Sequence, residues 1–329
     1  MVLFVDRAVV LGAGVMGARI AEVLALNNVN VILRDVDEAA LARGRKTIEG
    51  DLDQLVAFQA GKADRAVSEF ESKTGVALTP EQKQKAAEAL KPTFDAKRRE
   101  RLLSKITFTT GFDGFDKADL VIEAAPENAA LKKKIFAELV TKVPEHTVLA
   151  SNTSTLSISD LAAGLPPNRR GRFLGVHFFN PPTTLPLIEI IPGIESRADI
   201  VEDVVQWLAP LRNQRYPLIP IQVKECPGFL VNRILGPMLA EAFACYEEGI
   251  AKPKDIDLAM QTGAGFPMGP LALADLVGLD VIQHAAKSIR EQQGGIVAQR
   301  PVRIIDQLVA AGRLGQKSGR GFFDYTKES

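Results

Sequence analysis

Arg7-Ala-Val-Val-Leu-Gly-Ala-Gly-Val-Met-Gly17 is the stretch that decides the fold of this 329-residue chain. Residues 8–11 form a continuous apolar run, which is typical of a parallel strand covered on both faces. The run enters a Gly-x-Gly-x-x-Gly turn, and apolar residues then recur at helical spacing from Ala18 to Leu26. This order of strand, glycine-rich turn and helix predicts a Rossmann-type sheet that binds a dinucleotide.

The three glycines of the turn have separate tasks in such a site. Gly12 makes the tight turn, Gly14 lets the backbone approach a pyrophosphate, and Gly17 lets helix and strand pack closely. The N–H groups at the start of the following helix then meet the phosphates. We therefore expect cofactor contacts from residues of this turn: Gly12, Gly14, Val15, Met16 and Gly17.

An acidic residue at the end of the second strand indicates which dinucleotide binds. Asp35 follows Gly17 by 18 residues, where a carboxylate would hold the hydroxyls of the adenosine ribose. The same carboxylate would repel a 2′-phosphate, so the prediction is NAD rather than NADP. Two observations compete with it: Arg34 could serve a phosphate, and Asp35 could simply cap a helix.

The remaining pattern predicts a sheet domain followed by a helical one. From Glu38 to Leu103 the sequence is helical, charged and long, which indicates a helical hairpin inserted at about residues 45–103. Strand-like segments resume after the insert, and beyond Glu225 only helical patterns follow. We predict an α/β fold, with a Rossmann-type, mostly parallel sheet domain over residues 1–224 and a smaller all-helical substrate and dimerisation domain over residues 225–329.

Composition excludes several classes of function. Forty Lys and Arg balance forty Asp and Glu, so there is no overall field to attract nucleic acid or an anionic membrane surface. No apolar run approaches the roughly 20 residues of a spanning helix, and the N-terminus does not resemble a secretion signal. Two cysteines form no disulfide framework, and no Cys/His cluster has metal-ligand spacing. We expect a cytoplasmic protein with no metal.

A second stretch points to proton-transfer chemistry. His177 ends a predicted strand, and Glu189 lies at the centre of Leu187-Ile-Glu-Ile-Ile191, where a buried carboxylate is costly unless a partner satisfies it. A Pro-rich link joins the two segments, so we expect the pair to meet. A His held by a buried acid is how a general base is oriented, although the same pair would also serve a purely structural role.

A dinucleotide site and a His–Glu pair together imply hydride transfer. The oxidised cofactor takes a hydride from an alcohol carbon, so the hydroxyl proton must go to a base. An imidazole can take up and release that proton near neutral pH. Glu189 would stabilise the imidazolium as it forms.

Several motifs in order resemble those of the L-3-hydroxyacyl-CoA dehydrogenases of fatty-acid β-oxidation, either the short-chain enzymes or the dehydrogenase part of versions fused to an enoyl-CoA hydratase. The resemblance covers nearly the whole chain. It rests on the glycine turn and on Ala150-Ser-Asn-Thr-Ser154, His177-Phe-Phe-Asn-Pro181, Leu187-Ile-Glu189, Pro227-Gly-Phe-Leu-Val-Asn-Arg233 and Gly265-Phe-Pro-Met-Gly-Pro270.

The resemblance implies NAD-dependent oxidation of an L-3-hydroxyacyl-CoA to the 3-oxoacyl-CoA. It implies that His177 is the catalytic base, that Glu189 orients it, and that Ser154 and Asn232 bind the substrate near its 3-oxygen and thioester. A homodimer, or a place in a larger β-oxidation multienzyme, also follows from it. The implied cofactor contacts beyond the glycine turn are Asp35, Glu127, Lys132, Ser154 and Asn180.

One stretch departs from the family and leaves other substrates open. The family places a Lys and a hydroxyl at the start of the insert to meet the CoA nucleotide, whereas residues 49–58 here are acidic and then apolar. The alternatives are a dehydrogenase of a free 3-hydroxy acid or of a sugar acid such as gulonate. A non-enzymatic structural relative, as in lens, is a further alternative, but such a protein would need none of His177, Glu189, Ser154 and Asn232.

Overall fold

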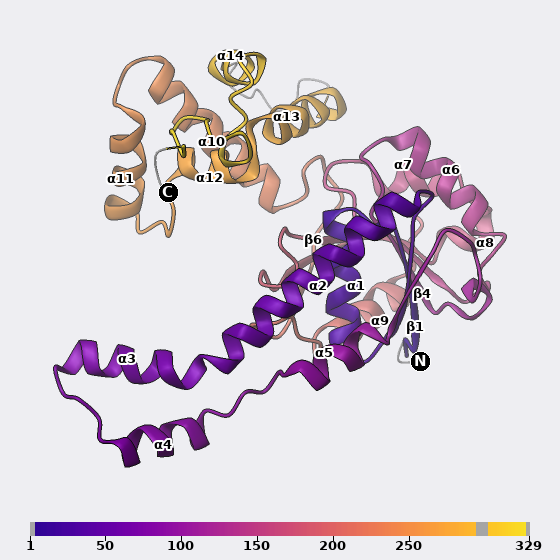
Figure 1. Cartoon of the computed structure of the whole chain (residues 1–329). Coiled ribbons are helices and arrows are strands. Elements are labelled where there is room, and N and C mark those ends of the chain that lie inside the picture. The colour runs from indigo at the N-terminus through magenta and orange to yellow at the C-terminus, as the bar shows by residue number, and fades with distance from the viewer. Residues whose placement is uncertain (1–3, 294–301, 327–329) are drawn as a thin grey trace. The chain divides into compact units, whose positions relative to one another are not determined.

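The computed structural model describes residues 4–293 and 302–326 and divides the chain into two compact units. Unit 1 comprises Met1–Thr153 and Ile158–Gln222. Unit 2 comprises the short segment Ser154–Ser157 and Val223–Ser329. Figure 1 traces both units along the chain.

Unit 1 is built on one eight-stranded sheet with the order β3-β2-β1-β4-β5-β6-β7-β8. All neighbouring strands run parallel except β6 and β7, which are antiparallel. The first six positions follow the doubly wound order, so the predicted Rossmann-type, mostly parallel fold is confirmed. The strands are β1 Arg7–Leu11, β2 Asn30–Arg34, β3 Ile106–Thr109, β4 Leu120–Glu123, β5 Val148–Ser151, β6 Phe173–Phe178, β7 Leu187–Pro192 and β8 Ile219–Gln222.

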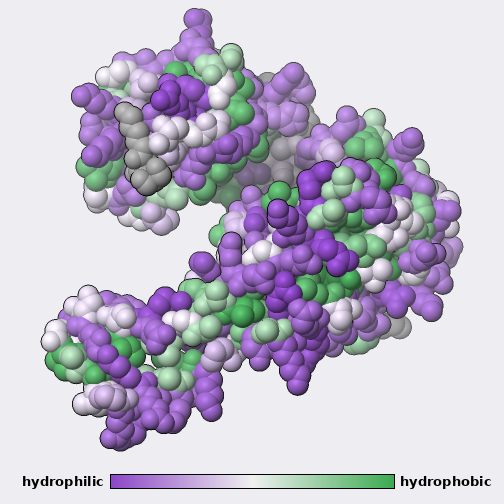
Figure 2. All heavy atoms as spheres, viewed as in Figure 1, coloured by the Kyte–Doolittle hydropathy of each residue, from purple (hydrophilic) through white to green (hydrophobic). Residues whose placement is uncertain are grey.

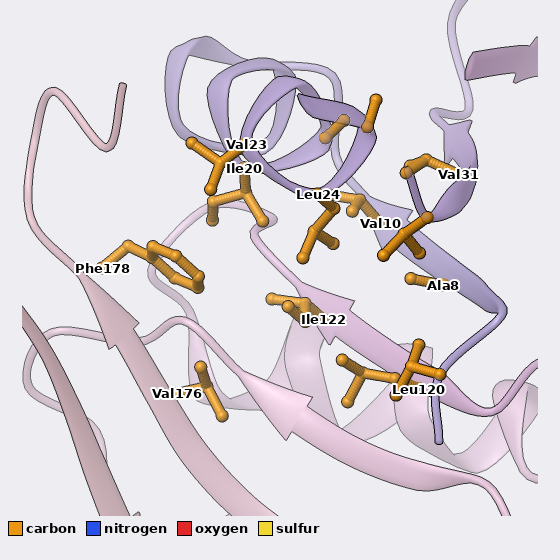
Figure 3. Close-up of a cluster of buried hydrophobic side chains, with 14 of the residues drawn as sticks. Ala8, Val10, Ile20, Val23, Leu24, Val31, Leu120, Ile122, Val176 and Phe178 are labelled. Carbon is orange, nitrogen blue, oxygen red and sulfur yellow. The ribbon is translucent and has the colours of Figure 1, made fainter. Parts of the chain in front are cut away.

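Helices cover both faces of this sheet (Figure 1). On one face α1 presses Ile20, Val23 and Leu24 onto side chains of the central strands, including Val10 and Ile122 (Figure 3). Burial of these β-branched and aliphatic side chains is the main stabilising contribution to the unit. The helices of unit 1 that lie against or beside the sheet are α1 Val15–Leu26, α2 Glu38–Ala60, α5 Ala96–Leu103, α6 Ala129–Leu139, α7 Ile158–Ala163, α8 Pro167–Arg170 and α9 Ala198–Leu208.

The charged insert forms a helical hairpin. Helix α2 packs on the core as far as Leu55, and the chain then leaves the sheet in α3 (Lys62–Thr74) and α4 (Pro80–Ala89), which lie side by side (Figure 1). A capping box begins α4: the Thr79 hydroxyl accepts a bond from the backbone N–H of Gln82, and the Gln82 side chain accepts one from the backbone N–H of Thr79. Helix α4 buries none of its side chains, as its polar sequence predicts.

The described part of unit 2 is mostly helical, and it ends in a short segment with isolated β-bridges at Gly315–Arg320 and Arg320–Asp324. Its α-helices are α10 Val231–Glu247, α11 Pro253–Gly263, α12 Pro270–Val277, α13 Leu279–Gln293 and α14 Ile304–Ala310. Helix α10 begins only after Gly228 and Phe229, because both residues have positive φ angles (76° and 48°) that no right-handed α-helix accepts.

A buried carboxylate fixes the end of unit 2. Asp275, on α12, is 1% exposed and accepts hydrogen bonds from the backbone N–H groups of Phe322 and Phe323 at 2.9 Å each. The Tyr325 hydroxyl donates to the same side chain. A Cβ on Gly321 would lie 1.9 Å from an Asp275 oxygen, so only glycine fits there.

Candidate active site

The glycine turn has the shape that a dinucleotide requires. Gly12 has φ +97°, and a Cβ there would lie 2.7 Å from the Ala124 carbonyl oxygen. A Cβ on Gly17 would lie 1.8 Å from the Gly12 carbonyl oxygen, so the helix packs on the turn only because that Cβ is absent. Gly14 faces open space, which is where a pyrophosphate would approach the backbone. Val15, which is exposed, and Met16 form the first residues of α1.

Asp35 is part of this turn rather than a helix cap. One of its carboxylate oxygens accepts a hydrogen bond from the Ala13 N–H at 2.7 Å, and the other accepts one from the Val36 N–H at 2.7 Å. The N-cap of α2 is Asp37, so the capping interpretation of Asp35 is wrong. Arg34 instead lies over the Phe112 ring, with its guanidinium carbon 4.5 Å from the ring centroid. The acid that would hold the ribose is therefore fixed to the turn that would hold the phosphates.

A buried charged network lies at the carboxyl ends of β4 and β5. The Lys132 ammonium is 2.6 Å from a Glu123 carboxylate oxygen, 3.0 Å from the Ala125 carbonyl and 3.4 Å from a Glu127 carboxylate oxygen. Lys132 and Glu123 are 1% and 0% exposed, and the Ser151 hydroxyl donates to the second Glu123 oxygen at 2.6 Å. Sequence reasoning did not single out Glu123. The sequence feature that could have identified it is an acid at the end of the apolar run Leu120-Val-Ile-Glu123, because ligands bind at the carboxyl ends of such strands.

The structure brings His177 and Glu189 together. They are direct cross-strand partners in the antiparallel β6–β7 pair, and the His177 Nδ1 atom lies 2.8 Å from a Glu189 carboxylate oxygen. Both side chains are buried, at 4% and 0% exposure. The Asn152 side-chain oxygen accepts a bond from the Phe178 N–H at 2.8 Å and so fastens the end of β6 to the segment after β5. Because Nδ1 faces the acid, the imidazole ring is held in one orientation.

The divergent stretch of the insert faces the same edge of the sheet. Asp51, on α2, forms an ion pair with Arg19 of α1 at 2.6 Å, and Arg19 also lies 3.4 Å from the Asn180 side-chain oxygen. A cavity of about 300 Å³ lies beside this pair. Its lining comprises Arg19, Asp51, Gln54, Leu55, Phe58, Gln59, Pro181, Thr183, Thr184, Gln214 and Arg215.

A buried acid lies behind the same ion pair. Glu22 is 1% exposed, and burial raises the pKa of its carboxyl from 4.5 to about 8, against a hydrogen bond from Gln214 that lowers it. The Gln214 amide donates to one oxygen at 2.6 Å, and the other oxygen has no hydrogen-bond partner among the described residues. Glu22 is therefore largely protonated at neutral pH.

The two remaining predicted residues belong to unit 2. Ser154 lies in the short segment Ser154–Ser157, and Asn232 is half-buried in the first turn of α10. Their roles toward the substrate stay predictions. Among the described residues no group of His, Cys, Asp and Glu side chains could hold a metal ion. In the same part of the chain no helix has the length and apolar character needed to cross a bilayer.

Known proteins resemble this chain over nearly its whole length. It is 35% identical over 323 residues to the mitochondrial hydroxyacyl-coenzyme A dehydrogenase of Sus scrofa, covering 98% of this chain and 92% of that one. It is 35% identical to a probable 3-hydroxybutyryl-CoA dehydrogenase of Bacillus subtilis, covering 99% of each. The crystal structure of (S)-3-hydroxybutyryl-CoA dehydrogenase from Ralstonia eutropha superposes with a TM-score of 0.78 at 35% identity, covering 98% of this chain and 100% of that one.

Family models match both parts of the chain. The NAD binding domain of 3-hydroxyacyl-CoA dehydrogenase matches residues 7–90 and 76–226, and the C-terminal domain of the same enzymes matches residues 228–325. The predicted resemblance and the NAD cofactor are thereby confirmed. The chain belongs to the 3-hydroxyacyl-CoA dehydrogenase family and is an NAD-dependent oxidoreductase that acts on a CH–OH group.

Proposed function

We propose that this enzyme oxidises an L-3-hydroxyacyl-CoA of fatty-acid β-oxidation to the 3-oxoacyl-CoA, with His177 as the base. The observation that carries the proposal is the buried contact of 2.8 Å between His177 Nδ1 and Glu189 at the sheet edge that also bears the glycine turn. A carboxylate inside two apolar strands is costly, and it gains a use if it stabilises a cation that forms during the reaction.

The proton transfer follows from this orientation. Because Nδ1 faces Glu189, the substrate's 3-hydroxyl proton goes to the other ring nitrogen, Nε2. Glu189 then stabilises the imidazolium. NAD, when bound, would accept a hydride from the substrate carbon that bears the 3-hydroxyl, and that carbon would become the 3-oxo carbon. Ser154 and Asn232 hold the 3-oxygen and the thioester in this proposal.

The cofactor is held in two places by the residues that the sequence predicts. The glycine turn and Asp35 take the pyrophosphate and the adenosine ribose. Glu127, Lys132 and Asn180 take the other end. Lys132 is almost fully buried between Glu123 and Glu127. We therefore propose that it fixes the position of Glu127 and acts on the cofactor through its positive charge rather than through direct contact.

The cavity beside Arg19 supplies a place for the CoA part of the substrate. Asp51 does not repel an anion there as a lone carboxylate would, because Arg19 neutralises it at 2.6 Å. Glu22, behind the pair, is largely uncharged near neutral pH. Arg215 adds a cation to the lining, and Phe58 adds an aromatic ring. We propose that Arg215 takes the role toward the CoA phosphates that a Lys of the insert has in the family.

The test is NAD reduction with four substrates. We expect turnover of 3-hydroxybutyryl-CoA and of a longer 3-hydroxyacyl-CoA, a higher KM for the matching pantetheine thioester, and no turnover of free 3-hydroxybutyrate. Turnover of the free acid in preference to its CoA ester would establish the free-acid alternative. Absence of turnover with all four, in a protein that still binds NAD, would favour the structural-relative alternative.

We also propose that the protein self-associates through unit 2. Large apolar side chains of this unit are exposed in the single chain: Leu230, Ile234, Ile250, Leu258, Met268, Leu276, Val277 and Val281. Exposed apolar side chains that gather on one unit mark protein–protein contact surfaces, and a symmetric dimer would cover them.

A further inference from the structure

A second cavity of about 360 Å³ lies in unit 1 at the amino-terminal edge of the sheet. It is lined by the end of α1, by the turn at Asn28, by α5 and by Lys105, which directly precedes β3. The glycine turn follows the carboxyl end of β1, and β1, β2 and β3 are parallel. The cavity is therefore at the opposite edge of the sheet from the dinucleotide turn and from His177.

The charge of this cavity is one-sided. Three cationic side chains line it (Arg98, Arg101 and Lys105), and no acidic residue is part of the described lining. The chain as a whole has no net charge, so this is a local excess. Figure 2 shows hydrophilic side chains gathered around α5.

The neighbouring cation Arg99 shows what a structural arginine on this helix does. It forms ion pairs of 2.6 Å with both Asp53 and Glu100. By contrast, within residues 4–293 and 302–326 none of the three cavity cations forms an ion pair with a carboxylate. Arg98 donates instead to the Thr93 carbonyl at 2.8 Å, and Lys105 lies 3.3 Å from the Asn30 side-chain oxygen. Their positive charges thus stay available to an anion.

The floor of the cavity is apolar. Phe94 and Leu102 are each 4% exposed, and Leu26 completes the floor. The Arg98 guanidinium carbon lies 5.7 Å from the Phe94 ring centroid, which holds the guanidinium across the ring. An apolar floor beneath a cationic rim suits a ligand that has a flat apolar part and a phosphate part. Arginine pairs in a bidentate manner with phosphate, and the volume lies in the range of small-ligand sites.

We infer that the cavity formed by Leu26, Phe94, Arg98, Arg101 and Lys105 is a second ligand site, separate from the cofactor site, for an organic phosphate of nucleotide size. The phosphates meet Arg98, Arg101 and Lys105, and the base packs against the exposed part of Leu26. This inference does not depend on which hydroxyacyl substrate the enzyme oxidises.

Calorimetric titration with ADP tests it, on protein that is already saturated with NAD so that the glycine turn is occupied. We expect binding whose affinity falls with added salt, and weaker binding of pyrophosphate, which lacks the base. Arg98→Gln/Arg101→Gln should weaken ADP binding about tenfold or more, because charge-assisted phosphate contacts are lost. Lys97→Gln is the matched control, since Lys97 is an exposed cation on α5 outside the cavity, and it should bind ADP as the wild type does.

The inference would be overturned by no ADP binding to the NAD-saturated wild type, or by an equal loss of binding in Lys97→Gln. A competing role for these cations is to offset the negative end of α1, whose last turn has no basic residue of its own. That role alone predicts a lower Tm for the double variant with wild-type ADP affinity, which would also overturn the site. If the double variant does not fold, Arg101→Gln alone gives the test, since in the described part of the chain no side-chain bond of Arg101 would be lost.

Discussion

His177 and Glu189 are two buried polar side chains whose pairing we expect to set the rate of the reaction. Either side chain alone in an apolar strand would be a buried polar group without a partner, which is costly. Here the His177 Nδ1 atom and a Glu189 carboxylate oxygen are 2.8 Å apart, so each is the other's partner. We expect His177→Gln to lower kcat about 10²–10⁴-fold, the range that general acid–base catalysis supplies. NAD affinity should barely change, because the glycine turn and Asp35 are intact. Steady-state kinetics and an NAD titration measure the two effects separately.

Glu189→Gln gives the control for this prediction. It keeps the shape of the acid but removes the charge that favours the imidazolium, so kcat should fall. The double variant should be little slower than His177→Gln, because an orienting group has no task once the base is gone. Two folded and fully active single variants would refute the mechanism. If instead both substitutions unfold the protein, the pair has a structural role.

Glu22 leads to a prediction about stability and pH. Burial raises the pKa of its carboxyl from 4.5 to about 8, so between these values the folded protein holds a proton that the unfolded chain has released. Its contribution to the free energy of unfolding therefore falls as pH rises through this window. Glu22→Gln mimics the protonated acid and removes this dependence.

The gain in stability of Glu22→Gln over wild type should be small at pH 5 and larger at pH 8.5, by up to a few kcal/mol at about 1.4 kcal/mol per unit of pKa shift. Thermal or urea unfolding at the two pH values measures it. Glu138→Gln, at an exposed position on α6, is the control and should show no such trend. A gain that is equal at both pH values would mean that Glu22 is ionised in the folded protein.

At the scale of elements, sequence periodicity predicts most of unit 1 because its strands are covered on both faces and read as continuous apolar runs. The strand at Arg7–Leu11, the glycine turn and the His177–Glu189 strand pair all follow from local pattern. Contacts between segments distant in the sequence could not be predicted. Asp51 meeting Arg19 and Gln214 meeting Glu22 depend on how α2 and the loop before β8 cross α1, which no local pattern records.

The turn between β1 and α1 gives a prediction at this scale. Asp35 accepts the Ala13 N–H at 2.7 Å, so it both shapes the turn and presents the carboxylate to the ribose. Asp35→Ala should weaken NAD binding about tenfold or more through lost charge-assisted hydrogen bonds, and should leave the fold intact. Asp113→Ala, an exposed acid elsewhere in unit 1, is the control. NADP(H) binding to the wild type as tight as NAD(H) binding would contradict the assignment of Asp35.

The whole molecule is two units with separate cores, and the predicted catalytic set draws on both. His177 and Glu189 belong to unit 1, whereas Ser154 and Asn232 belong to unit 2. The family's motifs predict this set although the four residues are far apart in the chain. Local physical reasoning predicts only the pair in unit 1, because the His and the Glu are 12 residues apart on neighbouring strands.

Self-association is the prediction that belongs to this scale. Sedimentation velocity at micromolar concentration should give a dimer, because exposed apolar side chains such as Ile234 and Ile250 gain free energy when they are covered. Ile234→Lys should shift the protein toward monomer if this surface forms the contact. Phe4→Lys, a substitution at an exposed apolar residue of unit 1, is the control. A monomeric wild type would mean that unit 2 needs no second copy.

The antiparallel pairing of β6 with β7 has a consequence for the evolution of this protein. The register that sets His177 opposite Glu189 also sets Ile190 opposite Val176 and Ile188 opposite Phe178. A slip of one residue would turn the acid to the other face of the sheet and exchange the buried aliphatic contacts as well. A mutation that misaligns His177 and Glu189 therefore also exposes the chain to unfolding and degradation. Selection for a stably folded protein is enough to preserve the β6–β7 register, even in a lineage that has no present need of the reaction.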